Sequence, residues 1–176
     1  MFDIRLEPEG AGSLKVHIGL DGESWDFAAD SLGRNLCESL VFAAAGLHGR
    51  VEEGFVADVE FYGGPDSDCL ILYITVEEEK VIVRLYYIED ADSAPKGTLG
   101  DCLIKVESTN SEVCEAVYRA LRALLIGHGL EYLSAEWQEF PVGAFIQLHR
   151  ALGNEPVLTG DGFDSELRCL LSMLDA

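Results

Sequence analysis

The sequence predicts an α+β fold, a mainly antiparallel sheet with about four helices packed largely on one face. Three observations predict it. Short runs of alternating apolar and polar residues are separated by glycine, proline and aspartate, as in strands joined by turns. Four longer segments carry apolar residues at helical spacing. The 176 residues fit a single domain, 1–176, long enough to bury a core without disulfides or metals.

The chain opens with two alternating runs, Phe2–Leu6 and Leu14–Leu20, which predict a pair of strands. A short acidic connection follows, in which we expect Trp25 and Phe27 to lie. The next apolar stripe has helical spacing up to Leu47. Its helix is expected to begin at Asp30 or Ser31, either of which can accept hydrogen bonds from the free amides of a helix start.

The stretch Phe55–Glu107 predicts four antiparallel strands. On their alternation alone, we expect one face to meet the helices with Phe55, Phe61, Val83, Leu85, Ile104 and Val106. The opposite face would carry Asp58, Glu60, Arg84, Tyr86 and Lys105 together with Leu70, Leu72 and Ile74. Such an amphipathic face is either solvated or a flat surface for a partner or a second copy of the chain.

Three further helices are predicted in the remainder of the chain. Thr109 and Glu112 have capping-box spacing before an apolar stripe that two glycines end near residue 127. Another helix should start at Pro141, and the last spans 164–174. The segment Leu130–Trp137 is open between a loose turn and an extended segment, which as a strand could run parallel to the fourth strand above.

The charge balance is the composition feature that bears most on function. The chain has 32 acidic against 12 basic residues, a net charge of −20 and a pI near 4.3. A surface of this kind repels nucleic acids and anionic membranes, so neither is expected as a partner. It favours a basic protein partner; the alternative is that the acidity serves only solubility.

The five cysteines and four histidines give no metal or cofactor signature. No CxxC or HExxH spacing occurs, and the aspartate pairs do not continue into an EF-hand loop, so neither a metal nor another cofactor is expected. An odd number of unpaired cysteines indicates free thiols and a reducing compartment. With no secretory signal and no apolar run near the ~20 residues of a membrane helix, we expect a cytoplasmic protein.

Alternating strand directions group the acidic residues at the two ends of the central sheet. The candidate partner-binding residues are Asp66, Asp68, Asp90 and Asp92 at one end, Glu77, Glu78 and Glu79 at the other, and Tyr86 on the amphipathic face. The loop that starts at Glu89 is long for a hairpin, and loops of such length are often functional.

These features predict a non-catalytic protein that binds and masks a basic protein, most concretely an immunity protein or inhibitor of a toxin. One alternative is a secretion or assembly chaperone, which would hold an extended client on the amphipathic sheet face and could form a homodimer. A second alternative is an enzyme of unknown class, although no stretch has the residue types and spacing of a specific catalytic motif.

Overall fold

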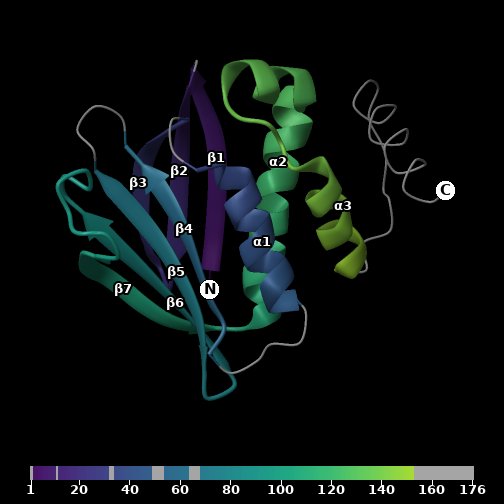
Figure 1. Ribbon diagram of the computed structural model, residues 1–176. Helices are drawn as coiled ribbons and strands as arrows, with labels where there is room; N and C mark the ends of the chain where they lie inside the picture. Colours follow the sequence, from purple (N-terminus) through teal and green to yellow (C-terminus); the bar gives the residue numbers. More distant parts are fainter. Residues whose placement is uncertain (1, 11, 32–33, 49–53, 64–67, 153–176) are drawn as a thin grey trace.

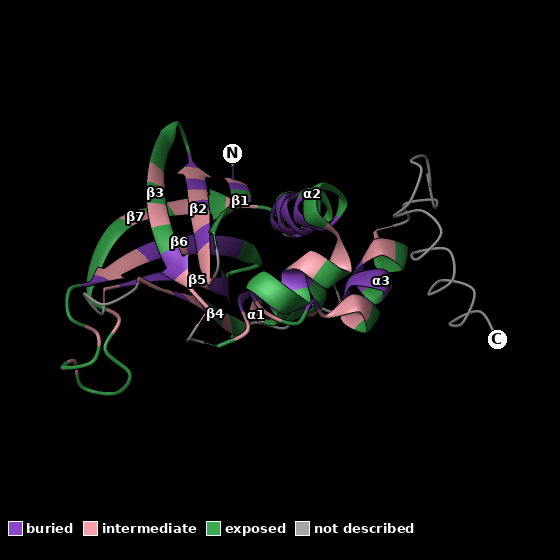
Figure 2. Ribbon diagram, turned by 90° about the horizontal axis from the view of Figure 1, so that it is seen from above, coloured by how far each residue is buried: buried purple, intermediate pink, exposed green. Residues whose placement is uncertain are grey.

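The computed structural model describes residues 2–10, 12–31, 34–48, 54–63 and 68–152. These residues form seven strands in two antiparallel sheets and three helices, which confirms the α+β class. Figure 1 shows the helices on one side of the sheets, and Figure 2 shows the same two layers from above. Among the described residues, no helix is long and apolar enough to cross a membrane.

The first sheet has the order β1 (Phe2–Gly10), β2 (Ser13–Leu20) and β3 (Glu23–Asp30). The predicted pairing of the first two runs is confirmed, but Trp25 and Phe27 lie in β3 rather than in a connection. The reason is a tight Asp21–Gly22 turn, with φ of 50° and 92°, which returns the chain at once.

The second sheet has the order β4 (Val56–Tyr62), β5 (Cys69–Glu77), β6 (Lys80–Ile88) and β7 (Asp101–Ser108). All three strand pairs are antiparallel, as the alternating runs predict. We expected a single sheet, but the strands form two sheets. Strand β3 of the first sheet lies beside strand β4 of the second. Their contact is close, since a Cβ added at Gly63 would lie 2.9 Å from Cζ of Phe27.

The register of β5 corrects the expected division of the sheet into two faces. Leu72 pairs with Val59 and Leu85, and directly paired residues share a face. The three residues expected outside are therefore buried on the helix side: Leu70, Leu72 and Ile74. Because β5 is apolar at both parities, its alternation could not reveal which side faces the core. Its outer face carries Ile71, Tyr73 and Thr75 instead.

The first helix, α1 (Leu36–His48), starts later than the sequence predicts, because β3 continues through Asp30. The expected start at Asp30 or Ser31 is wrong. Asn35 is the residue that satisfies the helix start, since its Oδ1 accepts the Glu38 N–H at 3.0 Å.

The second helix, α2 (Asn110–Glu136), has the predicted capping box. Thr109 Oγ1 accepts the Glu112 N–H at 3.2 Å, and Glu112 Oε2 accepts the Thr109 N–H at 3.0 Å. The helix kinks at Gly129 but continues, so the predicted strand or loose turn at Leu130–Trp137 is wrong. The continuation buries Leu133 and Trp137, which offsets the cost of glycine in a helix, about 1 kcal/mol per residue.

The third helix, α3 (Val142–Ala151), follows Pro141 as expected. The predicted helix at 164–174 lies outside the described residues. The expectation of about four helices is therefore slightly off for the described part of the chain, which contains three.

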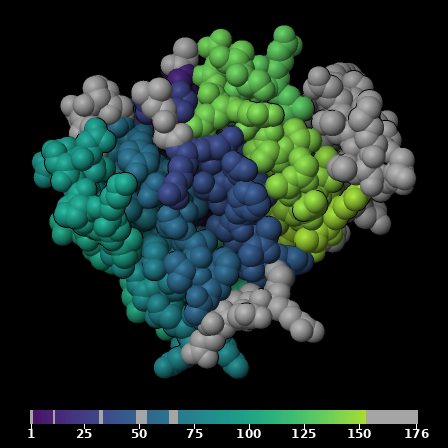
Figure 3. Space-filling view, viewed as in Figure 1, coloured from purple at the N-terminus to yellow at the C-terminus, as the bar shows by residue number. Residues whose placement is uncertain are grey.

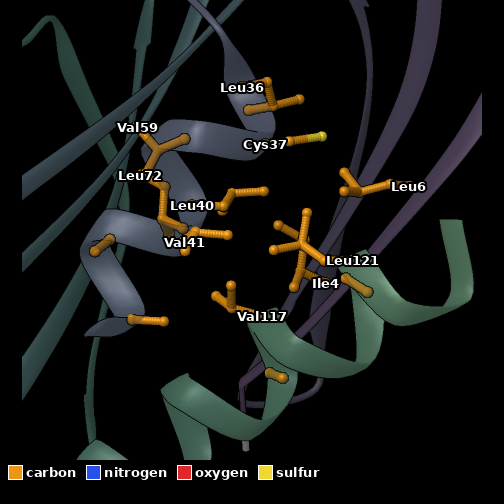
Figure 4. Close-up of a cluster of buried hydrophobic side chains, with 14 of the residues drawn as sticks. Ile4, Leu6, Leu36, Cys37, Leu40, Val41, Val59, Leu72, Val117 and Leu121 are labelled. Carbon is orange, nitrogen blue, oxygen red and sulfur yellow. The ribbon is translucent and has the colours of Figure 1, made fainter. Parts of the chain in front are cut away.

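One apolar cluster joins both sheets and the three helices. Figure 4 shows part of it: side chains of α1 lie between those of α2 and β1 on one side and those of β4 and β5 on the other. Leu40, Leu72 and Leu121 are fully buried there. Burial of such a side chain contributes about 1.5–3 kcal/mol, so the helices and both sheets stabilise one another.

The β5–β6 turn carries a testable strain. Its central residues, Glu78 and Glu79, both have positive φ, 51° and 64°, where Asn-Gly is strongly preferred. We expect the double variant Glu78→Asn/Glu79→Gly to raise the free energy of unfolding by about 1–2 kcal/mol, because left-handed backbone costs residues with a Cβ at least about 1 kcal/mol. Urea denaturation measures the difference.

The matched control is Glu78→Gln/Glu79→Gln, which removes the same two charges but leaves both residues with a Cβ. It should remain within about 0.5 kcal/mol of the native chain, as most surface substitutions do. Equal stabilisation by the two double variants would show that charge repulsion, and not backbone strain, limits this turn.

Candidate functional site

A groove lies on the outer face of the second sheet, on the side away from the helices. Its volume is about 1090 Å³, and β4, β5, the β6–β7 loop (89–100) and the segment after β3 line it. In Figure 3 the loop forms the teal atoms at the left, beside the blue atoms of β4. The volume lies just above the range of about 300–1,000 Å³ that is typical of small-molecule sites.

The floor of the groove is apolar. Cys69, Ile71 and Ile88 form a small buried cluster on the outer face of β5 and β6. Three residues of the 89–100 loop pack against it: Ala91, Ala94 and Leu99. The loop therefore folds back over one end of the sheet and forms a wall of the groove.

Hydrogen bonds fix the base of this loop. Asp68 Oδ2 accepts the Tyr87 hydroxyl at 2.6 Å, and Asp68 Oδ1 accepts the Asp90 N–H at 3.4 Å. At the other end of the loop, Gly100 has φ of 70°, and a Cβ there would collide with the Tyr87 carbonyl. Only glycine fits so close a contact, which ties the loop to the end of β6.

The rim of the groove is acidic. Asp58 and Glu60 project from the outer face of β4, and the guanidinium of Arg34 lies 3.7 Å from the first and 3.8 Å from the second. The Tyr62 hydroxyl donates to Glu60 Oε2 at 3.3 Å, and partial burial together with the Glu60 charge raises the pKa of Tyr62. Of the lining residues that the structure describes, four are carboxylates, Asp30, Asp58, Glu60 and Asp92, and two are cations, Arg34 and Lys96.

The rest of the outer face is an ordered polar network. Arg84, whose side chain is 14% exposed, donates to Thr75 Oγ1 at 2.8 Å and to both Glu77 oxygens at 2.8 and 3.1 Å. Hydrogen bonds from Thr75 and Arg84 lower the pKa of Glu77, so this carboxylate stays charged. Beside the network, the rings of Tyr73 and Tyr86 meet edge to face at 6.1 Å.

Of the predicted partner-binding residues that the structure describes, the acidic ones fall at the two sheet ends, as the strand directions require. Cys69 pairs with Ile88 at one end, and Glu77 pairs with Lys80 at the other. At the first end Asp68 anchors the loop at Asp90, Asp92 lines the groove, and Asp66 lies outside the described residues. At the second end Glu77 binds Arg84, while Glu78 and Glu79 form the turn; Tyr86 lies on the outer face between the ends.

The rim residues Arg34, Asp58 and Glu60 and the wall residue Tyr62 are absent from the predicted site. The alternation of β4 places Asp58, Glu60 and Tyr62 on one side of the strand, and that spacing was a usable signal. No sequence signal pointed to Arg34, because it lies before α1 and is brought close to β4 by the tertiary structure.

The cysteines of the described residues have no partner thiol, and three of the four are buried. Burial raises the pKa of Cys37 and Cys69 to about 12 and that of Cys114 to about 11. The thiol at the groove floor, Cys69, is therefore protonated near neutral pH and is a poor nucleophile. Within the described ranges, no three His, Cys, Asp or Glu side chains gather as a metal site.

A second titratable pair lies in the helical layer, away from the groove. The Tyr118 hydroxyl is 2.7 Å from His149 Nδ1, and Tyr118 stacks on Phe145 with ring centroids 5.4 Å apart. Partial burial, reinforced by Arg122 and Arg150, lowers the pKa of His149. This pair joins α2 to α3 and has a structural role.

Comparison with known proteins adds no relative: no family model, no curated protein and no solved structure matches the chain.

The cysteine environments predict the order of thiol reactivity. In a Cys169→Ser background, chosen because Cys169 lies outside the described residues, we expect exposed Cys102 to react rapidly with a thiol reagent such as DTNB. The three buried thiols should react only after denaturation, since local opening must expose them first. Spectrophotometric titration counts both classes.

The further substitution Cys102→Ser should remove the fast phase and leave three slow thiols. Rapid reaction of Cys69 in the native chain would contradict a closed apolar floor beneath the loop.

The lowered pKa of His149 predicts that the folded protein loses stability as the pH falls. The unfolded histidine binds a proton near pH 6.5, whereas the folded one does so only at lower pH, because its pKa is lowered. The unfolded state therefore binds more protons below about pH 6.5, and the free energy of unfolding decreases there. We expect His149→Asn to reduce this slope, measured by urea denaturation between pH 7.5 and 5.5.

The control is His48→Gln, which removes an exposed histidine and leaves the Tyr118–His149 pair in place. An identical pH dependence in the native chain and in His149→Asn would contradict the assignment.

Proposed function

We propose that the protein is a non-catalytic binder that masks a basic protein partner, most concretely an immunity protein or inhibitor of a basic toxin. The observation that carries the proposal is the groove itself, with an apolar floor and an acidic rim on an otherwise ordered sheet face. Such a combination suits a protein segment that brings both apolar surface and positive charge.

The overall charge supports the same partner. A net charge of −20 attracts a basic protein over long range and raises its association rate, whereas an acidic partner would be repelled. The rim carboxylates Asp58 and Glu60 would then pair with the partner at close range, where complementarity determines which basic protein is retained.

The strained β5–β6 turn supports a role for the acidic group at the second sheet end, Glu77, Glu78 and Glu79. Glu78 and Glu79 occupy backbone positions that favour Asn-Gly, so their presence costs stability. Residues kept at such a cost are often kept for function. Both are exposed at the end of the sheet, where they would extend the acidic surface beyond the groove.

The chaperone alternative draws support from strand β7. It is the last strand of the second sheet, and among the described residues nothing pairs with its outer edge. Leu103 on this strand is 39% exposed. An extended client, or β7 of a second copy, could add a strand there.

Affinity capture from native cells, followed by surface-binding kinetics on the captured protein, tests the proposal. We expect a basic partner whose association rate falls several-fold between 0.01 and 0.1 M salt, because the Debye length shrinks from about 30 to about 10 Å. Asp58→Asn/Glu60→Gln should raise the dissociation constant at least tenfold, about 1.4 kcal/mol. Glu77→Gln/Glu78→Gln/Glu79→Gln should act mainly on the association rate.

The matched control is Glu7→Gln/Glu9→Gln, which removes two exposed charges from β1, in the other sheet. Its dissociation constant should change less than twofold. Capture of an acidic partner, or an equal change of the dissociation constant in the groove variant and in this control, would contradict the proposal. The acidity would then serve solubility.

A further inference from the structure

We propose that the groove receives an arginine side chain of the basic partner, and that Arg34 occupies this place in the free protein. The inference rests on the proposed function and specifies its chemistry. It makes Arg34 an internal competitor that the partner must displace.

The geometry around Arg34 shows that the rim can take a guanidinium. Nη1 of Arg34 lies 3.7 Å from Asp58 Oδ2, and its Nε lies 3.8 Å from Glu60 Oε2. Different nitrogens of one planar group thus face two carboxylates on the same side of β4. The compact ammonium of a lysine presents a single point of charge, so an arginine suits the two acids better.

Arg34 is held loosely at its tip. Both nitrogen–oxygen distances exceed the 2.7–2.9 Å of a strong charged hydrogen bond, and the side chain is 71% exposed. A partner arginine that excludes water from the rim would form shorter bonds to the same carboxylates. The pairing of Arg34 is therefore exchangeable.

The main chain of Arg34, in contrast, is fixed. The Gln138 side chain donates to the carbonyls of Ser31 at 2.8 Å and Arg34 at 3.3 Å, and it accepts the Leu36 N–H at 2.9 Å. This clamp ties the segment before α1 to the end of α2. It keeps the Arg34 side chain at the mouth of the groove, so that a displaced guanidinium can return when the partner leaves.

Charge complementarity supports an incoming cation. Among the described lining residues, four carboxylates stand against Arg34 and Lys96, a net charge of −2 that becomes −3 when the Arg34 tip moves out. Near the groove stand Tyr62 and Tyr73, whose ring faces attract guanidinium groups. A neutral or acidic segment would leave the rim carboxylates without a counter-charge.

The test uses the full chain and N-acetyl-arginine amide as the probe, followed by ¹⁵N-HSQC spectra. We expect millimolar binding that shifts the backbone amide signals of residues 58, 60 and 62. The dissociation constant should be at least threefold lower in Arg34→Ala, because an internal competitor lowers the apparent affinity by the fraction of time that it occupies the site. Arg34→Gln should show the same lower dissociation constant. Each variant is folded if its amide signals away from the groove match those of the native chain.

Three comparisons isolate the effect. Arg5→Ala removes one charge from another exposed ion pair, with Asp3, and should bind the probe like the native chain. N-acetyl-citrulline amide, the neutral counterpart of the probe, should cause no shifts, and Asp58→Asn/Glu60→Gln should abolish those of the arginine probe.

Shifts outside the groove, equal binding of the citrulline compound, or weaker binding in Arg34→Ala would overturn the inference. A captured basic partner with the same affinity for Arg34→Ala, Arg5→Ala and the native chain would also overturn it, yet leave the masking function standing. Arginine binding at the rim without any basic partner would support the groove chemistry and remove the proposed function.

Discussion

The burial of α1 between α2 and the sheets is the interaction on which the rest of the structure depends. Seven of its 13 residues are buried, and it contacts β4, α2 and α3. Figure 4 shows that its side chains lie between the two sides of the core. Because α1 is fixed in this way, the segment that precedes it is fixed as well, and this segment carries Arg34 to the rim of the groove. The core therefore positions a side chain on the opposite, outer side of the sheet.

The second sheet has two faces of different character, and the difference follows from what covers them. The inner face is closed by the helices, while the part of the chain that the structure describes covers one end of the outer face with the 89–100 loop. The loop buries the apolar residues of β5 that the core leaves outside, Cys69 and Ile71. The rest of that face is polar and ordered and includes the ion pair of Arg84 with Glu77. A groove with an apolar floor and a charged rim results where covered and uncovered parts meet.

The sequence predicts the two acidic sheet ends but not the groove: of the residues predicted to bind a partner, Asp92 alone is among the described residues that line it. The two acidic ends follow from strand order and are where the turns place them. The groove centre joins Arg34, Asp58 and the loop, which are distant in sequence and meet only because α1 and β4 pack together. Local patterns carry no information on such contacts, since the energy that creates them is burial elsewhere in the core.

The sequence by itself determined the α+β class, the antiparallel pairing of the short runs, the capping box at Thr109 and the strong negative charge, because each depends on neighbouring residues or on composition. Only the tertiary structure decided the register of β5, the late start of α1 and the continuation of α2 past Gly129. In each case local signals were balanced or misleading: β5 is apolar on both sides, the Asp21–Gly22 turn adds strand β3 before α1, and Gly127 and Gly129 mark a helix end in the sequence although α2 kinks at Gly129 and continues. Burial of Leu72 sets which side of β5 faces the core. In α2, burial of Leu133 outweighs the interruption, since burying a large apolar side chain contributes more than a glycine in a helix costs.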